Sequence, residues 1–269
     1  MYLGSPGRMV GVKCPTRQRV GSSERYSFET TLEGRVKAQV VPLQRRSWDV
    51  ELGQLTTPSE VATLQEFASG AWGKGPFWFV SADAPVVNVL PPITSVFGGH
   101  VDGGPARLDD GTIAPFSVAR SDSTPGTLQF VGAGEDPPVI PGKSVTGSAW
   151  VTGTGASVLL QWFDGSGSVI GSAQTPPSQR VPAGQGAAVR VSVTGVPPAG
   201  AVCARLTARN AVSAARPAIT WTDQPYEYGD GQGCPKAVVL DVSRDVTKAW
   251  DDPRTGRWSN LSFTVQEVG

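Results

Sequence analysis

Hydrophobic and polar side chains alternate over the first part of the chain, which is the pattern of half-buried β-strands. Apolar residues take every second position in 26–30, 36–40 and 47–52, so that Trp48 and Leu52 share one face. A period of two with one apolar side predicts antiparallel strands that bury a single face. The strands end at a segment with a different period.

Residues 58–69 carry the one clear helical pattern. Thr57 is a good N-cap, Pro58 suits the first helical position, and Glu60 completes a capping box. The stripe at helical spacing consists of Val61, Leu64, Phe67 and Ala68, and Gly70 can end the helix in a left-handed cap. We expect this short amphipathic helix to lie across a sheet, followed by a strand at 76–80 that is buried on both faces.

The residue composition of the chain changes at Asn88–Pro92 and changes back near Trp221. The stretch between them is rich in Gly, Ser, Thr and Val, and turn residues such as Pro176-Pro177 divide it at regular intervals. The expected strands there are 127–131, 144–151, 157–163, 187–193 and 202–208. Short strands with regular turn signals predict a sandwich or jelly roll without helices.

This middle stretch interrupts another domain. The segment after Trp221 resumes with expected strands at 237–242 and 258–265, but it is too short to hold a core of its own. We therefore expect a discontinuous domain of residues 1–91 and 222–269 and an inserted jelly roll of residues 93–221. The expected fold class is mainly β with one α-helix.

Composition narrows the function classes. The 269 residues contain 23 basic and 23 acidic side chains, a balance that argues against nucleic-acid readout. The N-terminus lacks the apolar run of a signal peptide, and no stretch is apolar enough for membrane insertion. We expect synthesis and assembly in a host cytoplasm. Cys14, Cys203 and Cys234 have no metal-ligand spacing, so free thiols are favoured over a Cys14–Cys234 disulfide.

Several segments outside the insertion resemble minor tail proteins of long-tailed actinobacterial phages. The segments that carry this resemblance are Ser47–Val50, Glu66–Ala68, Gly70–Gly73, Gly75–Val80, Gly233–Val238 and Leu261–Val268. The resemblance implies a distal-tail or tail-tube-like β-sandwich with one α-helix, which assembles into a ring around the tail channel.

The insertion resembles a carbohydrate-binding-module jelly roll. The residues that carry this resemblance are Val139–Lys143, Gly147–Val151, Gln161–Gly167 and Ala201–Leu206. Such modules often carry a structural calcium, but the acidic residues Asp109, Asp110, Glu135 and Asp136 form no recognisable ligand pattern. We expect no cofactor and no metal, with a structural calcium as an unsupported alternative. A jelly roll that has lost sugar binding is a second alternative.

Sugars are bound by aromatic faces together with planar polar groups. The candidates for carbohydrate binding are Gln161, Trp162, Arg190 and Arg205. Strand parity places Arg190 and Arg205 outward if the neighbouring valines and leucines face the core. The competing interpretation is that Trp162 is a core residue and the arginines are ordinary surface, because Trp162 alternates with Val158 and Leu160.

An enzymatic function is not expected. The only histidine, His100, lies among glycines, and no nucleophile motif accompanies it. Asp109–Gly111 and Asp251–Pro253 are typical of turns rather than of catalytic carboxylates. A cell-envelope hydrolase is therefore the least favoured alternative.

The tryptophans of the outer domain suggest core and interface roles. Trp48, Trp72 and Trp78 are expected in the core, and Trp72, which glycines flank, is also a candidate for a subunit contact. Trp250 and Trp258 are equally compatible with an interface.

The expected function is structural: a tail-tip component of the virion that forms a ring, expected to be a hexamer, and displays the jelly roll outward. Its partners would be further copies of itself and neighbouring tail proteins. The alternative is an adsorption protein that binds a host cell-surface glycan, with avidity supplied by the ring.

Overall fold

The computed structural model describes residues 1–22, 26–40, 45–53, 56–95, 105–114, 118–119, 126–129, 136–248 and 258–268. The chain is mainly β, as expected, and its sheets pair antiparallel wherever a register is defined. It forms two compact units. The first contains Met1, 11–79 and 236–269, and the second contains 2–10 and 80–235.

The first unit is a sheet with one long helix. Its elements are β3 (Arg17–Ser22), β4 (Tyr26–Thr30), β5 (Val36–Val40), β6 (Arg46–Leu52), α1 (Pro58–Ser69), β7 (Phe77–Val80), β18 (Cys234–Lys248) and β19 (Trp258–Glu267). Five strands run in the order β7-β18-β19-β6-β3, so the strand that enters the insertion, β7, is the neighbour of the strand that leaves it, β18. Strands β4 and β5 form a separate two-stranded hairpin.

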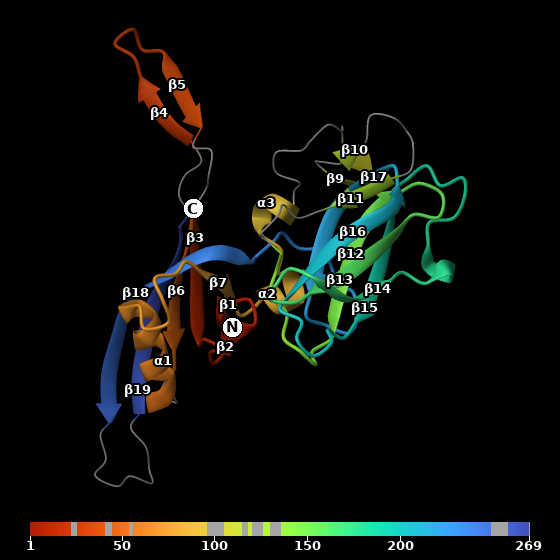
Figure 1. Ribbon diagram of the computed structural model, residues 1–269. Helices are drawn as coiled ribbons and strands as arrows, with labels where there is room; N and C mark the ends of the chain where they lie inside the picture. Colours follow the sequence, from red (N-terminus) through yellow and green to blue (C-terminus); the bar gives the residue numbers. More distant parts are fainter. Residues whose placement is uncertain are drawn as a thin grey trace. The chain divides into compact units, whose positions relative to one another are not determined.

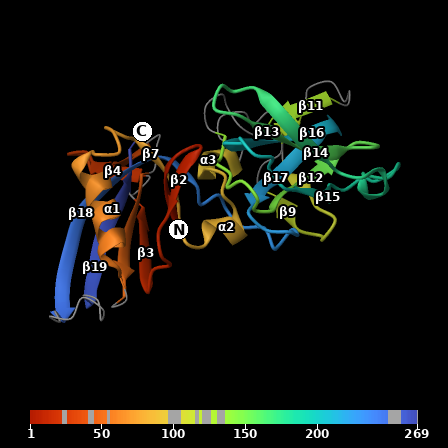
Figure 2. The same cartoon turned by 60° about the horizontal axis from the view of Figure 1, so that its bottom comes forward.

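Helix α1 lies along one face of this sheet (Figures 1 and 2). The expected capping box is present, because the Thr57 hydroxyl accepts from the Glu60 N–H while the Glu60 carboxylate accepts from the Thr57 N–H. Gly70 ends the helix with φ 80°, a left-handed conformation that glycine adopts without strain. The Phe67 ring meets Phe77 of β7 edge-on at 5.0 Å. The apolar stripe thus covers the sheet as its spacing predicted.

The second unit contains the remaining elements. They are β1 (Tyr2–Ser5), β2 (Arg8–Gly11), α2 (Ala84–Val87), α3 (Pro92–Ser95), β8 (Ala106–Arg107), β9 (Ile113–Ala114), β10 (Val118–Ala119), β11 (Gly126–Gln129), β12 (Val145–Thr152), β13 (Ser157–Phe163), β14 (Val169–Gln174), the 3₁₀ turn η1 (Pro177–Gln179), β15 (Val189–Gly195), β16 (Cys203–Ala211) and β17 (Ser213–Thr220).

Strand order identifies the second unit as a jelly roll. Its two sheets have the orders β10-β17-β12-β15 and β11-β16-β13-β14. The first of the eight strands pairs with the last, the second with the seventh, the third with the sixth, and the fourth with the fifth, all antiparallel. This is the arrangement of one long hairpin rolled into two sheets, which is the jelly-roll topology.

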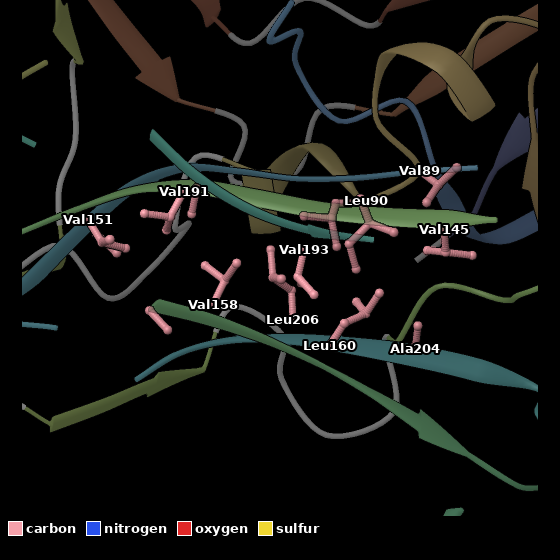
Figure 3. Packing of buried hydrophobic residues seen from close by; sticks show 14 of the residues in the cluster. Val89, Leu90, Val145, Val151, Val158, Leu160, Val191, Val193, Ala204 and Leu206 are labelled. Carbon is pink, nitrogen blue, oxygen red and sulfur yellow. The ribbon is translucent and has the colours of Figure 1, made fainter. Parts of the chain in front are cut away.

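The core of the jelly roll lies between the two sheets. Figure 3 shows side chains of β12 and β15, such as Val145 and Val193, pointing toward Leu160 of β13 and Leu206 of β16. Val158, Leu160 and Trp162 of β13 belong to this core, while Leu159 and Phe163, on the other face of the same strand, are buried outside it. Burial of such side chains stabilises a domain by about 1.5–3 kcal/mol each relative to exposure.

The borders of the insertion lie further out than the sequence suggested. The compact units change at Phe79/Val80 and at Pro235/Lys236, whereas the expected borders followed Pro91 and Trp221. The reason is packing: Val89 and Leu90 are fully buried in the jelly-roll core. In addition, residues 2–10 belong to the second unit, where the Tyr2 ring meets Trp221 edge-on at 5.0 Å.

A hydrogen-bonded clasp joins the entry of the insertion, 88–95, to its exit, 229–233. The Asn88 side chain accepts from Leu90 N and Ile219 N and donates to Pro217 O and Gly229 O, all at 3.1–3.2 Å. Gly231 passes so close that a Cβ there would lie 2.4 Å from the carbonyl oxygen of Leu90. The change in composition at Asn88 therefore coincides with the place where the two ends of the insertion are hydrogen-bonded to each other.

Several strands and short helices were not predicted, among them the two jelly-roll strands β14 and β17. Strand β17 contains Pro217, and β14 is rich in Ser, Gly and Ala, so neither shows the usual alternation. The expectation that 93–221 contains no helix was wrong, because α3 at its start and η1 between β14 and β15 each form a single turn. Both begin at a proline, whose fixed φ suits the first turn of a helix.

Candidate functional site

The four residues predicted to bind carbohydrate lie in three different places. Trp162 is 2% exposed and belongs to the core between the sheets, so its ring offers no face to a ligand. Gln161 and Arg205 face outward from β13 and β16, and Arg190 lies on β15 of the opposite sheet. The four side chains therefore do not form one site. The competing interpretation of Trp162 as a core residue holds.

Gln161 and Arg205 are direct neighbours across the β13–β16 pair. The Arg205 guanidinium donates to both carboxylate oxygens of Asp136, at 3.0 and 2.6 Å, and lies 4.6 Å from the centroid of the Phe163 ring. The hydrogen bond with Asp136 raises the pKa of Arg205. Because two of its guanidinium nitrogens already donate to Asp136, Arg205 stabilises this face of the sheet and is poorly suited to bind a ligand.

Arg190 belongs to a group of side chains that sequence reasoning missed. We call Trp150, Arg190, Arg216 and Tyr228 the arginine–aromatic cluster. The two guanidinium carbons lie 4.7 Å (Arg190) and 5.9 Å (Arg216) from the centroid of the Trp150 ring, and the Tyr228 ring stands perpendicular to it at 6.1 Å. Strand register explains part of this arrangement, because Trp150 of β12 is opposite Arg190 of β15 and Ala215 of β17.

Polar contacts hold this cluster in place. Asp109 accepts from Trp150 Nε1 at 2.9 Å and from the backbone N–H of Arg190 at 3.3 Å. Burial lowers the pKa of Arg190, and burial also raises the pKa of Tyr228. No sequence signal indicates this convergence, since the members come from three strands and a loop that lie far apart along the chain.

Similarity to known proteins does not add to this picture. No family model, curated protein or solved structure matches the chain. The assignment of function therefore rests on the residues and their geometry.

Other predicted chemistry finds little support in the described part of the chain. No group of three His, Cys, Asp or Glu side chains there could hold a metal ion. His100, Glu135, Trp250 and Asp251–Pro253 lie outside the described residues, and the side chain of Trp258 is also not described. Asp110 accepts from the N–H and hydroxyl of Thr112, which is the turn expected at Asp109–Gly111. Among the described helices, none has the length and apolar character needed to cross a membrane.

Exposed apolar side chains gather on the β4–β5 hairpin. Directly opposed residues of a hairpin share a face, and the pairs Phe28/Ala38 and Thr30/Val36 occupy one face while Glu29/Lys37 occupy the other. Phe28 is 67% exposed and Val36 is 65% exposed. An isolated two-stranded hairpin is marginally stable in water, so this apolar face is suited to a protein contact.

Two of the three outer-domain tryptophans expected in the core lie there, and Trp72 does not. Trp48 and Trp78 are buried, whereas Trp72 is 42% exposed, stacks on Phe67 at 5.0 Å and donates to Glu66 at 3.0 Å. These two contacts position Trp72 at the surface of the first unit, where it is a candidate for a subunit contact.

Cys14, Cys203 and Cys234 are not joined in disulfides, and they should differ in reactivity. Burial, followed by the Asp136 carboxylate, raises the pKa of Cys203 to about 11, and Cys234 is fully buried. A raised pKa leaves little thiolate at neutral pH, so we expect a disulfide reagent at pH 8 to label only the exposed Cys14 rapidly in the folded chain. Labelling of Cys203 should increase as the pH rises toward 11. Mass spectrometry of tryptic peptides after timed labelling measures this, and fast labelling of Cys203 at pH 8 would contradict it.

Proposed function

We propose that the chain is a structural component of a phage tail tip, which assembles with copies of itself into a ring and displays the jelly roll. The resemblance of the outer-domain segments to minor tail proteins supports this proposal. The placement of the insertion is compatible with this proposal, since the chain leaves the first unit after β7 and re-enters it at the neighbouring strand β18. A domain attached in this way can be added without changing the rest of the sheet.

The observation that carries the proposal is the apolar face of the β4–β5 hairpin. Phe28, Val36 and the tip residue Leu32 are all largely exposed. In a ring each copy presents the same patch to its neighbour, so one apolar patch is used once at every interface. The other face of the hairpin, with Glu29 opposite Lys37, would remain in solvent.

The test is the oligomeric state of the full chain. We expect light scattering and negative-stain images to show rings, with six copies per ring. The variant Phe28→Ser/Val36→Ser should shift the population at least tenfold toward monomer, because it removes apolar area from each contact. The matched control Glu29→Ser/Lys37→Ser changes the opposite face of the same strands and should leave the ring intact. A strictly monomeric wild-type chain at high concentration would contradict the proposal.

A second candidate function is adsorption to a host glycan. The arginine–aromatic cluster favours it, because it is a partly exposed set of aromatic and planar cationic groups on the outer face of the jelly roll. Repetition of such a site around a ring would raise a weak affinity by avidity.

A further inference from the structure

Trp150 packs with Leu108, Ala188 and Ala215 in a hydrophobic cluster separate from the core between the two sheets, which places the arginine–aromatic cluster on the other face of the sheet β10-β17-β12-β15. Trp150 is nearly buried there and forms the base. Around it stand two guanidinium groups and the ring of Tyr228, which is 5.4 Å from the guanidinium of Arg216. Tyr226, which is 43% exposed, lies two residues before Tyr228 in the same loop.

Arg190 is fixed before any ligand arrives. One of its terminal nitrogens donates to the hydroxyl of Ser148, at 3.3 Å, and to the carbonyl of Tyr226. Its Nε is buried without a hydrogen-bond partner in the described part of the chain. A positioned guanidinium loses little side-chain freedom on binding, which favours recognition of a planar anion.

Arg216 is held in a conformation that costs free energy. Its φ is 48°, in the left-handed region that residues with a Cβ rarely adopt. Within the described residues it has no hydrogen bond and no ion pair, and its contacts are with the rings of Trp150 and Tyr228. Strained residues of this kind gather at functional sites. The strain here places the guanidinium above two aromatic rings and within electrostatic reach of Asp110.

Asp109, Asp110 and Asp230 act electrostatically on members of the cluster, but within the described residues none of them accepts a hydrogen bond from the Arg216 guanidinium. Both carboxylate oxygens of Asp109 accept hydrogen bonds, from Trp150 and from the Arg190 backbone. Asp110 is engaged by Thr112, whose hydrogen bonds are the largest cause of its lowered pKa. The five N–H donors of Arg216 therefore stay available to an external acceptor.

We propose that the arginine–aromatic cluster binds the anionic group of an acidic saccharide, with Arg216 as the principal contact and Arg190 as its preorganised partner. The anionic group is a uronic-acid carboxylate or a sugar phosphate, since both present oxygen pairs that a guanidinium fork matches. The rings of Tyr226 and Tyr228 supply apolar area for the sugar itself. This proposal deepens the glycan-binding candidate and does not depend on ring formation.

The test measures binding of the full chain to three immobilised polysaccharides: polyglucuronic acid, phosphorylated dextran and neutral dextran. We expect saturable binding to at least one of the two anionic polymers and none to neutral dextran. Binding to only one of them identifies the carboxylate or the phosphate as the source of the charge. Failure to bind either anionic polymer, or equal binding to neutral dextran, would overturn the proposal while leaving the oligomeric state as a separate result.

Two variants separate the cluster from general charge and from folding. Arg216→Gly should lower binding at least tenfold without lowering the melting temperature by much, because glycine adopts φ 48° freely. Arg209→Gly removes the same charge from an exposed position on the other sheet and should change binding less than twofold. If Arg216→Gly does not fold, Arg216→Lys serves instead, since it keeps the charge, loses the fork and should still bind less. Unchanged binding of the anionic polymer by a folded Arg216 variant would overturn the proposal that Arg216 is the principal contact.

Discussion

Replacing Asn88 by alanine is expected to destabilise the jelly roll by about 3–5 kcal/mol, one of the largest effects of any single substitution in this chain. The Asn88 amide is fully buried and fills all four of its hydrogen-bonding positions. Alanine would leave two N–H groups and two carbonyls buried without these partners. Thermal unfolding followed by circular dichroism measures the loss, and the control Gln185→Ala, at an exposed loop position, should change stability by less than about 0.5 kcal/mol.

Asn88→Asp refines this expectation. An ionised carboxylate keeps both acceptors but cannot donate to Pro217 O or Gly229 O, and burial disfavours the charge. Burial would raise the pKa of the new carboxyl above its unfolded value, so the folded state would bind the proton more tightly. The deficit of this variant relative to the wild type should therefore shrink as the pH falls below neutrality. A deficit that is independent of pH would show that the clasp tolerates the charge.

Excision of the main segment of the second unit, 81–233, should leave a folded first unit that still carries residues 2–10. Removing 81–233 and joining β7 to β18 with ten Gly and Ser residues spans up to about 33 Å, which is ample for neighbouring strands. The buried side chains of the first unit, such as Trp48 and Leu64, stay in the chain. We expect a cooperative melting transition and a β-rich spectrum.

Excision at the borders suggested by sequence should give a worse protein. Removal of 93–221 retains Val89 and Leu90 but deletes the strands that bury them. The exposed apolar stubs should bind a hydrophobic dye and lower the solubility of the protein. Equal folding of both excised chains would mean that the clasp residues do not belong to the insertion.

Local signals predicted much of the fold because their physics is local. The alternation around Trp48 predicted β6, and the capping pair Thr57 and Glu60 predicted the start of α1. The parity of Val158 and Leu160 correctly placed Trp162 in the core and Gln161 outside. Strand β17 was not predicted because Arg216 and Pro217 interrupt its alternating pattern. The short helices were not predicted because a single turn has too few residues to show a period.

The candidate site was predicted only in part. Arg190 was selected for its outward parity, but Trp150, Arg216 and Tyr228 gave no signal, because what unites them is contact with one ring. Arg205 was selected for the same parity, and its pairing with Asp136 could not be foreseen from residues 69 positions apart.

The sequence by itself determined the mainly β class, the helix with its caps, the inward and outward faces of the strands, and the interruption of one domain by another. Each depends on neighbours within a few positions, where backbone geometry fixes which side chains share a face. The tertiary structure alone decided the jelly-roll strand order, the Asn88 clasp that sets the true borders of the insertion, and the convergence of two arginines on Trp150. These depend on register between strands that are distant in the chain, which only the packed core selects.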